Sequence, residues 1–217
     1  MGTKNLNKCL ACGTKNLRMF LDLGHQPLAN NFRPKMSEPT RRFPLRVAVC
    51  GDCFHSQLTV SVDPDSLFRS YLYTSGTTQT LNNYFDWFVE WSTREHTKSV
   101  DVLELASNDG TLLEKFQEDG HRVLGVDPAV NLISSASARG VPAVCDYWPG
   151  SIARALQPIF DVVVAMNVVA HVPNPLAFLA AIREFALAPG GRLFIQTSQA
   201  NMVSEAQFDT VYHEHIS

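Results

Sequence analysis

Four of the five cysteines form two Cys-x-x-Cys pairs, Cys9/Cys12 and Cys50/Cys53, with 37 residues between the pairs. A glycine lies within or directly after each pair, so backbone N–H groups can turn toward the sulfur atoms. Four thiolates from two tight turns suit the tetrahedral coordination of structural Zn²⁺ and leave no open position for catalysis. We therefore predict a structural zinc site.

Other uses of these thiols fit less well. The N-terminal residues contain no apolar segment of a secretory signal, which disfavours disulfides and leads us to expect a cytoplasmic protein. A redox Cys-x-x-Cys is usually single and opens a helix after a strand. His55 is the rival metal ligand, and Cys145 is expected to pack as a small buried hydrophobic residue.

The pattern of elements changes near residue 99. Before it we expect two cysteine turns, a Pro/Asn-rich irregular segment between residues 13 and 42, strands at 43–49 and 56–62, and an aromatic amphipathic helix over 81–91. After it, apolar strands alternate with helices. The expected strands are 100–105, 122–127, 141–145, 160–166 and 191–197, and the expected helices are 112–118, 130–139, 151–156 and 175–187.

Strands that are apolar throughout and alternate with helices predict an α/β fold with a parallel sheet covered on both faces. The predicted domains are a small zinc-binding domain over 1–65, a linker over 66–98, and a Rossmann-like α/β domain over 99–217.

Polar side chains cluster where three of these strands end, which is where ligands bind in open α/β sheets. Asp127 can accept both ribose hydroxyls of an adenosine ligand, and Asp146 can accept from an adenine amine beside the aromatic Tyr147. The predicted cofactor-binding residues are Glu104, Ala106, Ser107, Asn108, Asp109, Gly110, Asp127, Pro128, Asp146, Tyr147 and Asn167.

The charges of these residues select the cofactor. A dinucleotide site needs Gly-x-Gly-x-x-Gly against a pyrophosphate, whereas this turn offers only Gly110 and places Glu104 and Asp109 where they would repel phosphate. Two carboxylates suit a ligand that carries an ammonium and a sulfonium. We therefore predict S-adenosylmethionine, and not NAD, as the cofactor.

Several motifs are more specific than the fold. They are the two cysteine turns, Leu23–Asn30, Glu104–Gly110, Asn167–His171 and Tyr212–Ser217. With these motifs, in this order along nearly the whole chain, the sequence resembles the zinc-containing sugar C-methyltransferases that methylate C3 of dTDP-linked keto-deoxysugars. The resemblance implies a class I methyltransferase fold, with residues 99–217 as the domain that binds S-adenosylmethionine and ends just after the catalytic motif. It also implies a place in deoxysugar biosynthesis.

The resemblance also implies catalytic roles. His215 would be the general base that removes a proton next to a ketone, because an imidazole titrates near neutral pH. Glu214 would orient it, and Tyr212 would donate to the enolate oxygen. His171 would reach the same pocket, and Tyr73 would be a lid tyrosine. Structural or solvent-facing roles remain alternatives for His171 and His213, and so does a metal site of His213, Glu214 and His215.

Members of that family continue through a second Rossmann-like domain that helps to hold the nucleotide sugar. We expect this sequence to be a shorter relative, one part of a split enzyme, or a piece cut after the catalytic motif, with a separate or missing C-terminal domain as partner.

Charge is unevenly distributed. Residues 1–55 carry nine Lys/Arg and three Asp/Glu, although the whole chain has a net charge of −3. The basic part either faces phosphate, with the substrate lying between the two predicted domains, or is a solvated surface. The alternatives are an O- or N-methyltransferase of another small molecule and a non-catalytic zinc-ribbon module. Nucleic acid is disfavoured because basic and aromatic residues do not interleave, and no apolar run is long enough for a membrane span.

Overall fold

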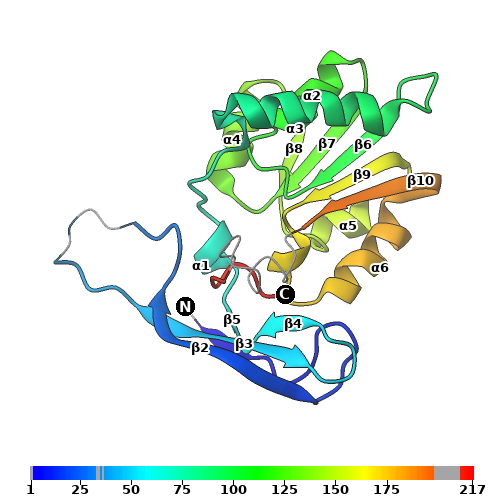
Figure 1. Ribbon diagram of the computed structural model, residues 1–217. Helices are drawn as coiled ribbons and strands as arrows, with labels where there is room; N and C mark the ends of the chain where they lie inside the picture. Colours follow the sequence, from blue (N-terminus) through cyan, green and yellow to red (C-terminus); the bar gives the residue numbers. More distant parts are fainter. Residues whose placement is uncertain (1, 33–34, 36, 198–210) are drawn as a thin grey trace. The chain divides into compact units, whose positions relative to one another are not determined.

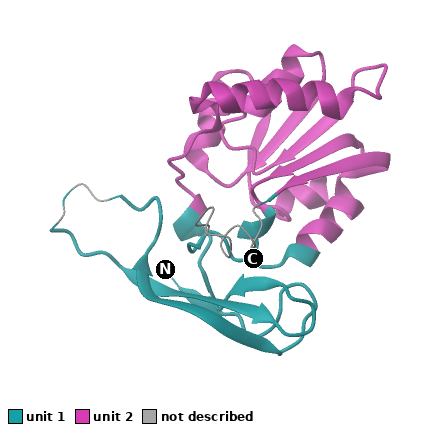
Figure 2. Ribbon diagram, in the orientation of Figure 1, with its two compact units in different colours: residues 1–67, 169–176, 197–217 teal, residues 68–168, 177–196 magenta. Residues whose placement is uncertain are grey.

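The computed structural model describes residues 2–32, 35, 37–197 and 211–217 (Figure 1). By their contacts these residues form two compact units (Figure 2). Unit 1 comprises Met1–Leu67, Val169–Leu176 and Thr197–Ser217, and unit 2 comprises Phe68–Val168 and Ala177–Gln196. The units are therefore discontinuous in sequence. The domains predicted from the sequence, residues 1–65, 66–98 and 99–217, remain predictions.

Unit 1 is built on antiparallel strands. Strands β2 (Leu17–Pro27), β3 (Arg42–Cys50) and β4 (Ser56–Leu58) form one sheet, and β1 (Thr3–Asn5) pairs with β5 (Val60–Val62). A small core of Leu45, Val47 and Leu58 is covered by Leu21 and Val211. The short 3-10 helix η2 (Val169–His171) also belongs to this unit.

Strand β2 corrects the expectation of an irregular segment between residues 13 and 42. All eleven of its residues are partly or fully exposed. The sequence therefore lacks the alternation of buried apolar and exposed polar residues that would predict a strand. The pairing of β2 with β3 also shifts between Met19 and Leu21 and between Asp22 and His25. Backbone hydrogen bonding to β3, and not a buried face, defines this strand.

Unit 2 contains a parallel five-stranded sheet in the order β10-β9-β6-β7-β8. The strands are β6 (Asp101–Leu105), β7 (Arg122–Asp127), β8 (Ala143–Cys145), β9 (Phe160–Met166) and β10 (Leu187–Gln196). The side chains of Val102, Leu103, Leu105 and Val162 through Ala165 are inaccessible to solvent. This burial explains why β6 and β9, the central strands, are largely apolar in sequence.

Helices cover both faces of this sheet (Figure 1). Helices α2 (Gln79–Thr93), α3 (Thr111–Glu118) and α4 (Val130–Ala138) lie on one face, and α5 (Ser151–Ala155) and α6 (Pro175–Phe185) lie on the other. Phe85, Phe88 and Phe116 pack on Val102 and Val164 in the main core. The aromatic stripe predicted over 81–91 is thus part of a core helix. A short helix α1 (Asp65–Phe68) and the 3-10 helix η1 (Ser75–Thr77) precede α2.

The end of α6 differs slightly from the sequence prediction. The helix stops at Phe185, two residues earlier than expected, because Leu187 already pairs with Phe160 in the sheet. Residues 189–191 lie inside β10, where the register shifts before Arg192 and Gly190 adopts a φ of +82°. Among the described residues, none of the helices has the length and apolar character needed to cross a bilayer.

Candidate active site and zinc site

The four cysteines predicted as metal ligands converge in unit 1. Their sulfur atoms all lie within 4.8 Å of one another. The Cys9–Cys53 and Cys12–Cys50 sulfur pairs are each 3.6 Å apart. A tetrahedral Zn²⁺ with bonds of about 2.3 Å places sulfurs about 3.8 Å apart, whereas a disulfide needs about 2.05 Å. The donor set therefore fits zinc.

Backbone N–H groups support the thiolates, as the glycine-containing turns predict. The N–H of Cys12 points at Cys9 Sγ at 3.5 Å, and the N–H of Asp52 points at Cys50 Sγ at 3.4 Å. His55 lies outside this ligand group. Cys145 is exposed, which corrects the prediction that it is buried, and its thiol points at the carbonyl of Pro128.

Glu104 and Asp127 lie at the carboxyl ends of β6 and β7 in unit 2. Glu104 is 6% exposed, and its Oε2 is buried with no hydrogen-bond partner. Burial, followed by the charges of Asp127 and Asp109, raises the pKa of Glu104 well above its usual value. Burial also raises the pKa of Asp127 to about 6, against the lowering effect of N–H donors from Ala129 and Asn108. A cation bound beside such carboxyl groups would favour their ionised forms.

The turn after β6 has an unusual backbone conformation. Ala106, Asn108 and Gly110 adopt positive φ angles of 57°, 52° and 77°. Gly125 of β7 packs beneath this turn, because a Cβ there would meet Ser107 Oγ at 2.5 Å. The Oγ of Ser107 is itself buried without a hydrogen-bond partner.

Two of the predicted acidic residues also have structural roles. Asp109 Oδ1 accepts from the backbone N–H and the hydroxyl of Thr111 at the start of α3. Asp146 Oδ2 accepts from the Ser151 hydroxyl and the Ile152 N–H, so it caps α5. Capping hydrogen bonds keep the pKa of Asp146 low although burial acts in the opposite direction.

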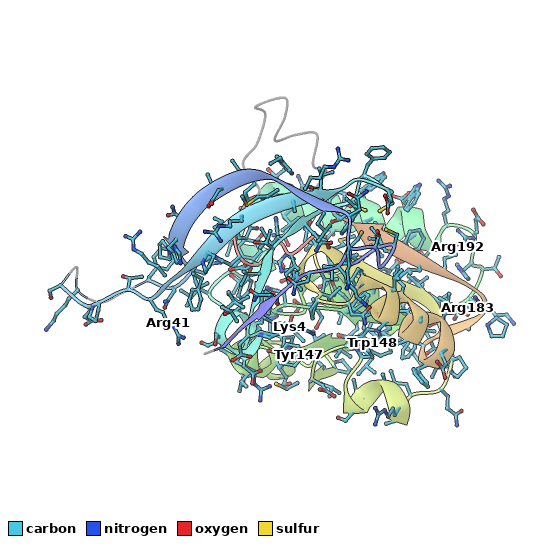
Figure 3. The ribbon with its side chains drawn as sticks, turned by 90° about the horizontal axis from the view of Figure 1, so that it is seen from below. Lys4, Arg41, Tyr147, Trp148, Arg183 and Arg192 are labelled. Carbon is cyan, nitrogen blue, oxygen red and sulfur yellow. The ribbon has the colours of Figure 1, made fainter. Side chains whose placement is uncertain are left out.

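The remaining predicted cofactor residues lie in the loops that follow β7, β8 and β9. Tyr147 and Trp148 follow β8 and are labelled in Figure 3, and Trp148 donates its indole N–H to the carbonyl of Phe178. Asn167 is exposed after β9 with a φ of 52°. Pro128 accepts through its carbonyl from the Cys145 thiol. Tyr73 is 51% exposed.

The predicted catalytic residues, except Tyr73, gather in unit 1. The Tyr212 hydroxyl lies 2.7 Å from His215 Nε2. The rings of His171 and His215 have centroids 4.9 Å apart. Burial, and then the neighbouring His215, lowers the pKa of His171 to about 3, so its imidazole is neutral. Burial, and then Glu214, raises the pKa of Tyr212 to about 12.

Glu214 and His213 are buried polar members of this motif, each 1% exposed. Glu214 Oε1 accepts from Asn30 Nδ2 at 2.9 Å. His213 Nε2 lies 3.3 Å from the Phe43 carbonyl, so a solvent-facing role for His213 is wrong. Asn30 is the residue that sequence reasoning missed. Its position in the Leu23–Asn30 motif was the available signal, and its φ of 61° marks it in the structure.

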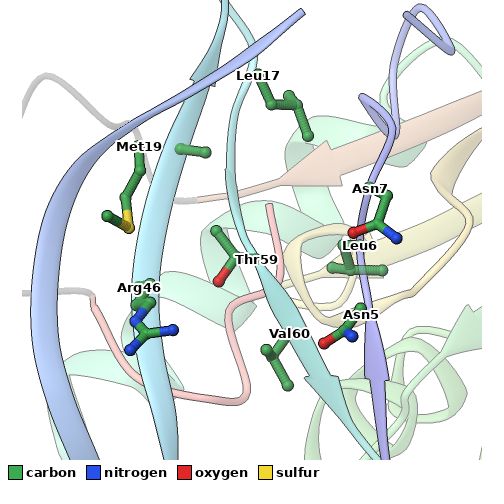
Figure 4. A pocket seen from close by; sticks show the side chains of 9 residues that line it. Asn5, Leu6, Asn7, Leu17, Met19, Arg46, Thr59 and Val60 are labelled. Atoms are coloured by element: carbon green, nitrogen blue, oxygen red, sulfur yellow. The ribbon is translucent and has the colours of Figure 1, made fainter. Parts of the chain in front are cut away.

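Unit 1 also contains an open pocket of about 360 Å³, lined by Asn5, Asn7, Arg46, Thr59 and neighbouring apolar residues (Figure 4). None of its lining residues belongs to the predicted catalytic or zinc-binding sets. Arg46 is paired there with Asp22 at 3.0 Å.

Two protein-family models match the sequence. The one described as "Putative zinc binding domain" matches residues 9–68. The one described as "Methyltransferase domain" matches residues 51–217, well over half of the chain. The chain belongs to this methyltransferase family. The matches confirm the predicted fold class and the methyltransferase family, and with the cysteine cluster they support zinc and S-adenosylmethionine as metal and cofactor.

Two curated relatives illustrate the similarity. The C-methyltransferase NovU of Streptomyces niveus is 29% identical over 98% of this chain and 52% of its own length. A ubiquinone biosynthesis O-methyltransferase of Xylella fastidiosa is 36% identical over 44% of this chain and 41% of its own length. This methyltransferase thus spans about half the length of the curated relatives that it matches.

Among solved structures, the plantazolicin methyltransferase BpumL in complex with a pentazolic desmethylPZN analogue and SAH is similar. It has a TM-score of 0.51 and 15% sequence identity, and the match covers 64% of this chain and 56% of that one. This similarity shows a shared fold.

Proposed function

We propose that this methyltransferase transfers a methyl group from S-adenosylmethionine to a carbon next to a ketone, in a nucleotide-linked deoxysugar. The observation that carries the proposal is the pairing of Tyr212 and His215, with Oη and Nε2 2.7 Å apart. An imidazole that is ready to accept a proton beside a phenol is what enolate formation requires.

The two side chains would act as a coupled acid–base pair. While His215 Nε2 carries a lone pair, it accepts from the Tyr212 hydroxyl. The phenol O–H would first turn from Nε2 to the substrate carbonyl oxygen, which frees the lone pair of Nε2 to take the proton from the substrate carbon. The phenol would then donate to the enolate oxygen, where negative charge has developed.

Neighbouring groups would maintain this arrangement. His171 is held neutral by its surroundings, so it adds no positive charge that would oppose proton uptake by His215. Glu214, held by Asn30, would orient His215, its neighbour in the chain. Tyr73, half exposed ahead of η1, would cover the substrate.

Glu104 and Asp127 would hold the cationic cofactor, and the turn Ala106–Gly110 would approach it through its backbone. Asn167, Pro128, Asp146 and Tyr147 would complete the cofactor site. When bound, S-adenosylmethionine supplies an electrophilic methyl group: the enolate carbon forms the new C–C bond as the C–S bond breaks, which leaves S-adenosylhomocysteine and the ketone.

The substrate class is supported by the first 55 residues and by NovU. Nine basic residues against three acidic ones suit a diphosphate-linked ligand. The match to NovU, a named C-methyltransferase, extends over 98% of this chain and includes the zinc-binding part. A zinc-ribbon module without catalysis would account for residues 9–68 only.

The test is His215→Asn compared with His25→Asn, which alters an exposed histidine of β2 outside the catalytic motif. A dTDP-linked keto-deoxysugar in D₂O is followed by NMR for deuterium entry next to the ketone. His215→Asn should slow this exchange by about 100-fold or more while S-adenosylhomocysteine binding persists. His25→Asn should exchange like the unmodified protein. Equal exchange in both variants would remove His215 as the base.

An O-methyltransferase is the second candidate, because the Xylella relative has that activity and matches 44% of this chain. A hydroxyl acceptor needs no carbon acid. In that case the protein would methylate without any exchange of deuterium next to a carbonyl.

A further inference from the structure

The segment Arg69–Gly76, here called the strap, runs along the loops that carry the proposed cofactor residues of unit 2. Apart from the start of η1 it has no regular secondary structure, and Leu72 and Tyr73 are exposed. The carbonyl of Arg69 accepts from the N–H of Val130 at 3.3 Å, just after the loop that follows β7. The strap therefore depends on individual hydrogen bonds for its position.

Asn131, on the first turn of α4, binds the strap through both ends of its carboxamide. Its Oδ1 accepts from the Tyr71 N–H at 3.1 Å, and its Nδ2 donates to the Tyr71 carbonyl at 2.8 Å. Both backbone groups of one residue are thus satisfied by one side chain. This arrangement imitates the pairing that a neighbouring β-strand would supply.

Asn108 makes a second attachment, and it comes from the cofactor turn itself. Its Nδ2 donates to the Tyr73 carbonyl at 3.0 Å, and its Oδ1 accepts from the Ser75 N–H at 3.0 Å. The backbone N–H of Asn108 donates to Asp127 Oδ2 at 2.9 Å. One residue therefore links the strap to the carboxylate that would accept the ribose hydroxyls.

Gly76 closes the strap against the start of α3. A Cβ at this position would meet Thr111 Oγ1 at 2.7 Å and Asp109 Oδ2 at 3.5 Å. The absence of a side chain at Gly76 lets the strap approach Asp109, which accepts hydrogen bonds at the start of α3. The strap is fixed near the ends of both β7 and β6.

We infer that Asn131 is a positioning residue that couples the order of the strap to cofactor binding. The inference rests on the proposed placement of S-adenosylmethionine at Glu104 and Asp127. A ligand that immobilises Asp127 and Asn108 restricts the strap through the Asn108 hydrogen bonds. When Asn131 already holds the strap, ligand binding costs less conformational entropy than it would with a free strap. The ligand therefore binds more tightly.

The experiment measures amide hydrogen exchange of residues 69–76 and the affinity for S-adenosylhomocysteine in the full chain. In the unmodified protein the ligand should slow exchange of the strap. Asn131→Ala should speed exchange in the ligand-free protein by about 10-fold and weaken the affinity by about 3- to 10-fold, since it removes two hydrogen bonds at an exposed site. Asn131→Asp keeps the acceptor for the Tyr71 N–H but sets a carboxylate oxygen against the Tyr71 carbonyl, so it should also speed exchange of the strap.

Asn83→Ala is the matched control, because Asn83 is an exposed helical asparagine whose amide oxygen accepts from the Gln79 side chain. It should change neither quantity. Unchanged strap exchange in Asn131→Ala would overturn the attachment. Faster exchange with unchanged affinity would overturn the coupling. If Asp127→Asn leaves the affinity unaltered, the cofactor placement and the coupling both fail, whereas the exchange in the ligand-free protein still reports on Asn131.

Discussion

Asp127 and Glu104 are buried in surroundings that favour their protonated forms, and this is the most informative feature at the scale of single residues. Burial raises the pKa of Asp127 to about 6, and the pKa of Glu104 is also raised. The sequence could predict both positions, because acidic residues at strand ends are visible as a pattern. Their burial could not be predicted, since it depends on packing of the Ala106–Gly110 turn over β7.

The raised pKa of Asp127 predicts a pH dependence. Between pH 4 and 6 the folded protein retains a proton that the unfolded chain, with a pKa of 3.8, has released, so stability falls as pH rises through this window. The free energy of unfolding should drop by up to about 3 kcal/mol. Urea unfolding of Asp127→Asn should show a flatter profile than the unmodified protein. Parallel profiles would contradict the assignment.

Asn30 illustrates what residue patterns miss, because its contact with Glu214 joins positions 184 residues apart. Asn30→Gly retains the left-handed backbone and removes the donor, so it should lose about 1–2 kcal/mol of stability in urea unfolding. Asn30→Asp places a second carboxylate beside Glu214 and should be less stable still at pH 7. That extra loss should shrink at pH 5; an Asp variant as stable as the Gly variant would refute the contact.

At the scale of elements, the β/α alternation after residue 99 was predictable because the parallel strands are mostly apolar and β6 and β9 are buried over most of their length. Strand β2 was not, because its side chains are mostly exposed and its pairing with β3 is irregular. The strap shows the same limit. Asn131 lies in a helical segment whose sequence gives no sign of a special contact. Its hydrogen bond with Tyr71 is visible only in the three-dimensional structure.

The turn after β6 depends on the absence of a side chain at Gly125. Gly125→Ala would drive a Cβ against Ser107 Oγ and Leu113 Cδ1, at 2.5 and 2.9 Å. We expect a loss of about 1–3 kcal/mol in thermal or urea unfolding and weaker binding of S-adenosylhomocysteine. Adding Ser107→Ala should restore part of both. Gly2→Ala, where a Cβ has open space, is the control. A fully stable Gly125→Ala would argue against this packing.

At the scale of the whole molecule, the two compact units do not follow the order of the sequence. His171 and Tyr212–Ser217 group with the N-terminal residues in unit 1, whereas the proposed cofactor residues belong to unit 2. A linear pattern assigns all of them to residues 99–217. Long-range contacts within unit 1, such as those of Ile216 with Leu58 and Ala170, decide the grouping.

Zinc should stabilise unit 1 selectively, since its four ligands all come from that unit. Cys53→Ser should lose bound zinc by elemental analysis, and β2 and β3 should lose protection from hydrogen exchange while β6 and β9 retain it. Cys145→Ser, which alters a cysteine outside the ligand group, should keep one zinc per chain. Equal zinc content in both variants would contradict the site.

The most direct measurement is a crystal structure of the full chain with S-adenosylhomocysteine. We predict its ribose hydroxyls within hydrogen-bond distance of the Asp127 carboxylate and its ammonium near Glu104. Density for the ligand elsewhere, or none at saturating concentration, would contradict the proposed cofactor site and the mechanism that depends on it.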